Sequence, residues 1–177
     1  MVSAPIAPLA VSLGDPAGIG PEVISKCWDH RSAFNLPAFL AVGDARSLSA
    51  VWDGPIVTID DPRDTDAAFD VGLPIIHIGA AEADIPGRPS VPGAHCSLDS
   101  LEIAVGLARS GSASAVTTGP VSKQQLYGIG FAHPGQTEFV AERCGVASEN
   151  VAMMLAGPSL RTVPVTTHLR LAAVPER

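Results

Sequence analysis

The chain has 177 residues, of which 46% are hydrophobic and 5% aromatic, and its formal net charge is −7. This length and apolar content allow a sizeable buried core, which excludes a disordered chain. The negative charge, with no cluster of Lys and Arg, disfavours binding to nucleic acids or to anionic membranes.

Short aliphatic runs bounded by Gly, Pro and Asp predict strands in the first two thirds of the chain. A helix is expected from Pro21 to about Trp28, because proline suits the first helical turn and Glu22 favours the positive end of a helix. The segment 79–94 is loop-like, and apolar residues at spacings of three and four then predict a helix from Ser97 to Arg109. The predicted strands are 8–13, 39–42, 56–59, 75–78 and 115–117.

Beyond these strands, the pattern predicts a helical start through Lys123, a helix over 137–144, and a hairpin. The hairpin would join the apolar runs 151–155 and 160–166 across Gly157-Pro158. Strands that alternate with helices predict an α/β fold with a mainly parallel sheet and flanking helices. We expect a first α/β domain over 1–128 and the beginning of a second over 129–177. The apolar pattern continues into Pro175 with no closing element, so we expect a truncated sequence.

The cysteines and the first residues indicate the compartment. Cys27, Cys96 and Cys144 lie far apart with no Cys-x-x-Cys spacing, which argues against a disulfide framework and a zinc finger. Residues 1–12 are broken by two prolines and have no leading positive charge, so we expect neither a signal peptide nor a membrane span. These features predict a cytoplasmic protein with reduced thiols.

Two glycine-containing motifs follow predicted strands. Residues 14–22 read Gly-Asp-Pro-Ala-Gly-Ile-Gly-Pro-Glu, and glycines there would let the backbone approach an anion at a helix N-terminus. The motif is not Gly-x-Gly-x-x-Gly, so its spacing alone favours a tight turn without a ligand. Residues 117–123 end in Lys123, at the carboxyl end of a strand, where ligands bind in open α/β sheets. Lys123 is a candidate for a carboxylate or phosphate contact, with a simply solvated side chain as the alternative.

Two further motifs carry polar side chains. In His133-Pro-Gly-Gln-Thr-Glu138, Gln136 and Thr137 offer neutral donors and acceptors for a polar substrate. The alternative role of Thr137 is to cap the following helix. His168 follows an apolar run, and by itself it is a weak metal candidate, because a metal normally takes three or more protein ligands.

In their order along the chain and in their residue identities, the four motifs resemble those of the 4-hydroxythreonine-4-phosphate dehydrogenase family. The nonapeptide 14–22 is the most specific part, and the resemblance extends from about Leu9 to Val174. Residues 153–155 and 160–169 follow in the family's order. The resemblance implies a fold similar to that of isocitrate and isopropylmalate dehydrogenases.

The resemblance also implies an activity. It is the NAD- or NADP-linked oxidation of 4-phosphooxy-L-threonine, followed by loss of carbon dioxide to give 3-amino-2-oxopropyl phosphate in pyridoxal phosphate biosynthesis. A divalent metal (zinc, magnesium or cobalt) would bind the alcohol oxygen and stabilise the enolate. By position, His168 corresponds to the first of three metal-binding histidines, and Gln136 and Thr137 correspond to the substrate-binding pair. The resemblance also implies that the complete protein forms a homodimer.

This chain departs from the family pattern in two ways. Many members have His where this chain has Gln136, and a neutral amide cannot act as a cation or proton shuttle. The other two metal histidines, and the Lys, Asn and Arg that hold substrate, belong to a C-terminal half that the 177 residues do not include. We therefore expect the chain alone to be inactive.

Three alternatives remain open at the level of sequence. A paralogous dehydrogenase of this kind would act on phospho-threonate or phospho-erythronate. A phosphate-acetyltransferase-like protein, which has a related fold, would transfer an acyl group without NAD or a metal histidine. The third alternative is a non-catalytic truncated product.

Overall fold

A computed structural model describes residues 7–79, 85–166 and 169–176. The chain divides into two compact units, Met1–Gln136 and Thr137–Arg177, and each is described by itself. The expected domain boundary at 128/129 concerns complete domains, and it stays a prediction.

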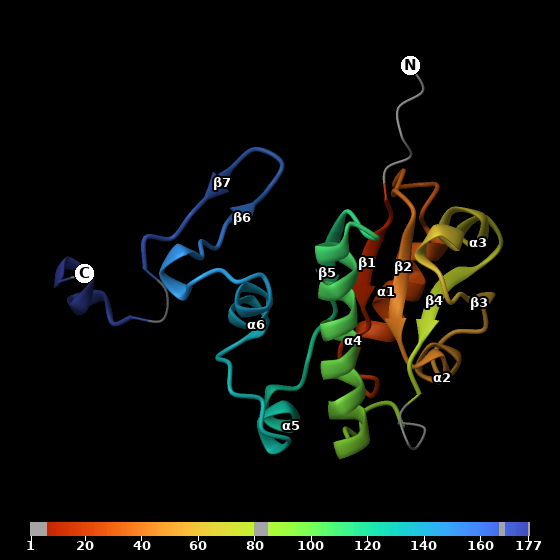
Figure 1. Cartoon of the computed structure of the whole chain (residues 1–177), viewed down its shortest axis with the longest axis horizontal. Coiled ribbons are helices and arrows are strands. Elements are labelled where there is room, and N and C mark those ends of the chain that lie inside the picture. The colour runs from red at the N-terminus through yellow and green to blue at the C-terminus, as the bar shows by residue number, and fades with distance from the viewer. Residues whose placement is uncertain (1–6, 80–84, 167–168, 177) are drawn as a thin grey trace. The chain divides into compact units, whose positions relative to one another are not determined.

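The first unit is built on a five-stranded parallel sheet with the order β3-β4-β2-β1-β5 (Figure 1). This arrangement confirms the predicted α/β fold with a mainly parallel sheet. Each of the five expected strands is present within a few residues of its predicted bounds. The strands are β1 (Leu9–Ser12), β2 (Phe39–Gly43), β3 (Ile56–Thr58), β4 (Leu73–His77) and β5 (Ala115–Thr118).

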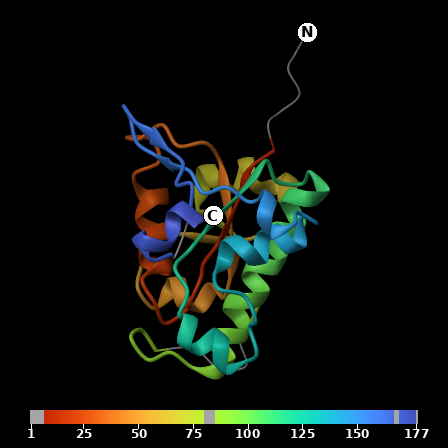
Figure 2. The same cartoon turned by 90° about the vertical axis from the view of Figure 1, so that its left-hand side faces the viewer.

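Helices cover both faces of this sheet, as the aliphatic strands require. On one face, Ile24 and Trp28 of α1 pack with Val11 in one apolar cluster. On the other face, Ala104 of α4 packs with Leu40. Figure 2 shows α1 and α4 on opposite sides of the strands. The helices of this unit are α1 (Gly20–Asp29), α2 (Ala45–Ser49), α3 (Thr65–Val71), α4 (Val91–Ser110) and α5 (Lys123–Gly128), and the 3₁₀ turn η1 (Pro62–Asp64) precedes α3.

Helix α4 begins at Val91, so the prediction of a loop over 79–94 and a helix start at Ser97 is wrong there. Ser90 is the N-cap, and its Oγ accepts a hydrogen bond from the Gly93 N–H at 3.0 Å. Pro92 lies in the first turn, where a proline costs no hydrogen bond. No described helix is long and apolar enough to cross a membrane.

The second unit contains short elements only. Its hairpin pairs Leu155 with Thr162 in antiparallel fashion, which confirms the turn expected at Gly157-Pro158. Each strand has two residues, shorter than the predicted runs, because both strands are exposed and a two-stranded hairpin without a packed face is marginal. The elements are α6 (Gln136–Arg143), which starts at the unit boundary, η2 (Ser148–Asn150), β6 (Leu155–Ala156), β7 (Arg161–Thr162) and η3 (Leu171–Glu176).

Candidate functional site

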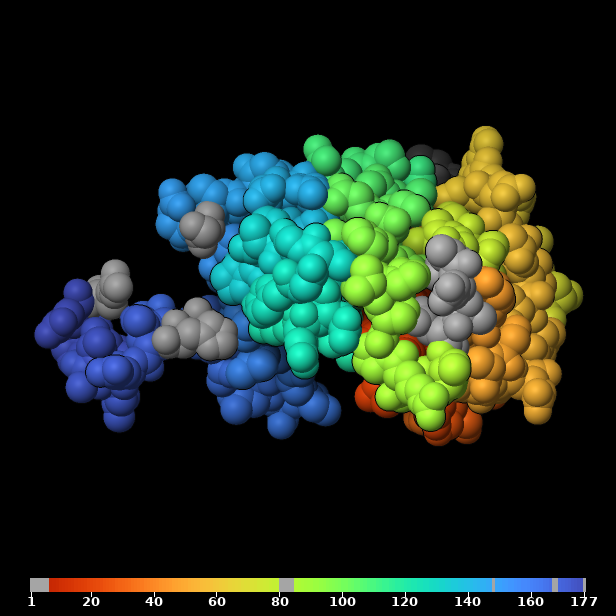
Figure 3. Space-filling view, turned by 90° about the horizontal axis from the view of Figure 1, so that it is seen from below, coloured from red at the N-terminus to blue at the C-terminus, as the bar shows by residue number. Residues whose placement is uncertain are grey.

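Three of the four sequence motifs meet at the carboxyl ends of β1 and β5. The Asp15 N–H donates to the carbonyl oxygen of Pro120 at 3.0 Å, which joins the loop after β1 to the loop after β5. The Gln136 Nε2 donates to the carbonyl oxygen of Gly119 at 3.2 Å, which adds the third motif. The strands in Figure 1 point downward, so Figure 3 views the carboxyl ends, and the residues of α5 lie at that surface.

The glycines of the first two motifs serve the contact between these loops. Gly14 has φ +73°, and a Cβ there would lie 2.2 Å from the Pro120 carbonyl oxygen. A Cβ on Gly119 would lie 2.5 Å from the carbonyl oxygen of Leu13. The close approach is therefore of backbone to backbone, which favours a tight structural turn for residues 14–22 over an anion cradle.

Two side chains of α5 form hydrogen bonds to the third motif, residues 133–138. Lys123 Nζ and Tyr127 Oη both donate to the carbonyl oxygen of Pro134, at 2.8 and 3.3 Å. The two side chains are four residues apart on one helix, so they lie on the same face. The Lys123 ammonium thus positions the loop before Gln136, a role that neither sequence-level alternative for Lys123 included.

The Gln136 side chain presents an acceptor atom that no described residue contacts with a hydrogen bond. Its bond to Gly119 uses the amide nitrogen, and this fixes which end of the side chain is the oxygen. The Oε1 atom is buried and has no hydrogen-bond partner among the described residues. A buried acceptor of this kind is suited to a donor such as a hydroxyl or an ammonium group. Thr137 is exposed and lies inside α6, so the alternative that it caps this helix is wrong.

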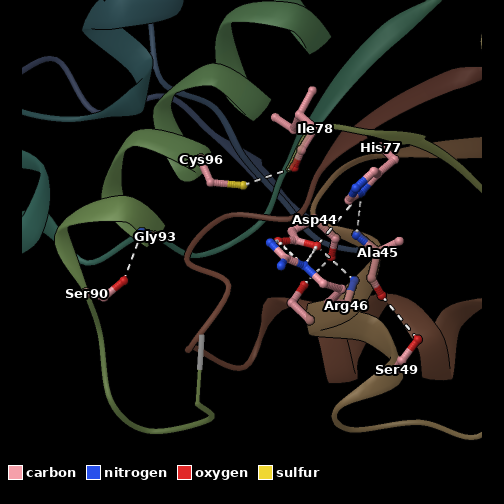
Figure 4. A network of polar contacts seen from close by, with 10 residues as sticks. Asp44, Ala45, Arg46, Ser49, His77, Ile78, Ser90, Gly93 and Cys96 are labelled. Atoms are coloured by element: carbon pink, nitrogen blue, oxygen red, sulfur yellow. Dashed lines mark hydrogen bonds and ion pairs between the residues drawn. The ribbon is translucent and has the colours of Figure 1, made fainter. Parts of the chain in front are cut away.

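A polar network that the sequence analysis missed lies at the ends of β2 and β4 (Figure 4). Asp44 is buried, caps α2 through the Arg46 N–H at 2.9 Å, and also accepts from the Arg46 guanidinium. The Ala45 N–H donates to His77 Nδ1 at 3.1 Å, so a neutral His77 carries its proton on Nε2. The available signal was an Asp immediately after a strand, which is a common helix cap. The network thus caps the N-terminus of α2 and fixes the His77 ring beside its first turn through a hydrogen bond.

The metal prediction lies outside the described residues, because it concerns His168 and the structure describes neither Thr167 nor His168. Within the described ranges, no group of three His, Cys, Asp or Glu side chains is close enough to hold a metal ion. Cys27, Cys96 and Cys144 form no disulfide with one another. The described residues alone therefore do not make a metal centre.

Comparison with known proteins adds a consistent set of relatives. The model of the pyridoxal phosphate biosynthetic protein PdxA family matches residues 35–177. A 4-hydroxythreonine-4-phosphate dehydrogenase of Zymomonas mobilis is 50% identical over 162 residues, covering 92% of this chain and 48% of that protein. The enzyme of the same name from Erythrobacter litoralis is 49% identical over 176 residues, covering 97% of this chain and 52% of that protein.

A solved structure agrees with these relatives. The crystal structure of a 4-hydroxythreonine-4-phosphate dehydrogenase from Burkholderia phymatum superposes with a TM-score of 0.81 at 32% identity. The match covers 94% of this chain and 52% of that one. The chain thus spans about half the length of the relatives that it matches.

Proposed function

Because the chain belongs to the pyridoxal phosphate biosynthetic protein PdxA family, we propose that it provides the N-terminal half of a 4-hydroxythreonine-4-phosphate dehydrogenase. The complete enzyme would oxidise the secondary alcohol of 4-phosphooxy-L-threonine. The hydride would pass to NAD or NADP, and carbon dioxide would then leave to give 3-amino-2-oxopropyl phosphate. The names and identities of the relatives support this activity.

In this proposal, Gln136 and Thr137 bind the substrate. The observation that carries it is the buried Gln136 Oε1, which has no partner among the described residues although the amide nitrogen is anchored. The substrate has a hydroxyl and an ammonium group, and both are donors that this oxygen can accept. Since an amide stays neutral, Gln136 orients the substrate and transfers no proton.

The proposal assigns one metal ligand to this chain, His168. When bound, a divalent zinc, magnesium or cobalt ion supplies a Lewis acid for the alcohol oxygen. The other ligands and the nicotinamide contacts would come from the part of the relatives that this chain does not cover. A homodimer in the cytoplasm is part of the same proposal, and three cysteines without a disulfide are compatible with that compartment.

A covalent fusion tests this function. Arg177 would be joined to the C-terminal half of the Zymomonas mobilis relative, and NADH formation from 4-phosphooxy-L-threonine would be followed with and without a chelator. We expect chelator-sensitive NADH formation, and we expect Gln136→Ala to raise KM more than it lowers kcat. Higher kcat/KM with phospho-threonate would assign the paralogous activity instead, and acetyl transfer without metal would contradict the proposal.

A further inference from the structure

The loop that carries Gln136 reaches the place where the strand order of the sheet reverses. β2 lies on one side of β1, and β5 lies on the other. In open α/β sheets, ligands bind outside the carboxyl ends of the strands at such a switch point. Gln136 Nε2 donates to the carbonyl oxygen of Gly119, the residue directly after β5. The position of the Gln136 Oε1 atom at this edge therefore depends on how firmly its loop is held.

Two side chains of α5 hold the loop two residues before Gln136. The Pro134 carbonyl oxygen accepts from Lys123 Nζ at 2.8 Å and from Tyr127 Oη at 3.3 Å. A carbonyl oxygen has two lone pairs, so it can accept both hydrogen bonds at once. Both side chains are exposed, which means that their bonds fix the loop and contribute little to the core.

The backbone that leads to Gln136 has little burial to keep it in place. Phe131 is buried, and its N–H donates to the Leu126 carbonyl oxygen of α5 at 3.0 Å. Residues 132–136 are only half-buried or exposed. Gly135, directly before Gln136, adds backbone freedom because it has no side chain. The two bonds to Pro134 thus limit the movement of the backbone just before the proposed substrate contact.

We propose that Lys123 and Tyr127 are positioning residues for substrate binding that act through Gln136. By fixing the Pro134 carbonyl group, they keep the Gln136 amide nitrogen on Gly119 and leave Oε1 available to a donor of the substrate. This inference rests on the proposed function, in which Gln136 binds the substrate. Because the two donors share one acceptor, each partly replaces the other, and their losses should not be additive.

The fusion enzyme described above tests the pair through a mutant cycle. Lys123→Met and Tyr127→Phe each remove one donor. We expect KM for 4-phosphooxy-L-threonine to rise about twofold in each single variant and about tenfold in the double variant, with kcat changed less than about twofold. In a Gln136→Ala background, the same double substitution should change KM less than about twofold, because the side chain that it positions is absent.

The matched control is Gln124→Met, at an exposed position of α5 next to Lys123. Adjacent residues of a helix point in different directions, so this substitution should leave KM unchanged. A rise of KM in the control as large as that in the double variant would overturn the inference, because any change on the surface of α5 would then have the same effect.

A measurement on the 177-residue chain separates the positioning from the activity. NMR would follow the exchange of the Gln136 side-chain amide protons with water. We expect the double variant to exchange about fivefold faster or more, because the bond to Gly119 opens more often. If the fusion is inactive but this exchange is faster, the positioning of Gln136 stands and the proposed function falls. An unchanged exchange rate overturns the positioning, whether or not the fusion is active.

Two further results would overturn the inference. One is a KM in the active fusion that stays the same in the double variant, or that rises equally with and without the Gln136 side chain. The other is loss of the circular dichroism spectrum in either single variant, which would show that Lys123 or Tyr127 is needed for folding instead.

Discussion

Two serines of α4 show how neighbouring residues of one type can contribute oppositely to stability. Ser100 is fully buried, donates to the Val42 carbonyl oxygen at 2.6 Å and accepts from the Leu13 N–H at 3.2 Å. Ser97 is one turn away and equally buried, but its Oγ has no hydrogen-bond partner among the described residues. Burial of a hydroxyl is costly unless its hydrogen bonds are made.

Substitution of these serines should therefore have opposite effects. Ser100→Ala is expected to lower the free energy of unfolding by about 1 kcal/mol, because two buried hydrogen bonds are lost while the Leu13 N–H keeps its bond to the Val42 carbonyl oxygen at 3.0 Å. Ser97→Ala should be neutral or stabilising by up to about 1 kcal/mol. Urea denaturation of both variants checks this, and a loss of stability in Ser97→Ala as large as that in Ser100→Ala would contradict it.

Gly14 and Gly111 show two different reasons why a position requires glycine: a left-handed backbone conformation, and a lack of space for a side chain. Both have positive φ, +73° and +79°, but a Cβ would meet the Pro120 backbone at Gly14 and nothing within 4 Å at Gly111. Gly111→Ala should cost about 1–2 kcal/mol through conformation alone. Gly14→Ala should cost about 3 kcal/mol or more, because the loops after β1 and β5 must also separate. Equal unfolding midpoints for the two variants would show that this loop contact is not tight.

The carboxyl group of Asp61 makes a contribution to stability that depends on pH. Its side chain accepts hydrogen bonds from the Arg63 side chain and N–H, and these lower the pKa of the carboxyl group from 3.8 to about 2. Since the folded-state pKa is lowered, the contribution of this pair is present above pH 3.8 and is lost as the pH falls through about 2. NMR titration should show this pKa, and Arg63→Ala should return it toward 3.8. An unchanged pKa in that variant would exclude Arg63 as the cause.

At the scale of elements, the sequence predicted those helices and strands whose apolar residues form a clear local pattern. The five parallel strands were found because each is an aliphatic run between turn residues. The start of α4 was missed, since Pro92 and the glycines nearby suggested a loop, whereas Ser90 and Pro92 are the cap and first turn of a helix. Helix α3 was not predicted, because seven residues between a 3₁₀ turn and Gly72 carry too short a pattern.

The candidate site was predictable only in part, for a related reason. Gln136 was identified through the order of motifs, but its bond to Gly119 joins segments whose proximity no local pattern reports. The bond from Lys123 to the Pro134 carbonyl oxygen adds a role in loop positioning, and only the tertiary structure shows it. Contacts of this kind depend on how βα loops meet at the sheet edge, which periodicity does not encode.

At the scale of the molecule, the described part of the chain contains one unit with a packed sheet and one unit of short elements. The first unit has a packed sheet, with Leu40 and Ala41 fully buried, so it has a core of its own. The second unit consists of one short helix, 3₁₀ turns and an exposed hairpin. The described residues of these units include the loop that carries Gln136 but no metal centre.

We therefore expect the isolated chain to show no dehydrogenase turnover. The purified 177-residue protein should produce no NADH from 4-phosphooxy-L-threonine above a blank that contains no protein, with or without added divalent metal. The fusion with the C-terminal half of the relative is the matched positive control. Turnover by the isolated chain that persists through further purification and scales with its concentration would contradict this expectation.

The pairing of Leu9 in β1 with Ala115 in β5 also has a consequence for biosynthesis. β1 leaves the ribosome shortly before β2, but β5 emerges only after α4 has been made. At typical translation rates the interval between β2 and β5 is on the order of several seconds, much longer than a hairpin needs to form. During that interval the nascent β1 has only one of its two sheet neighbours, so its other edge stays unpaired until β5 has been made.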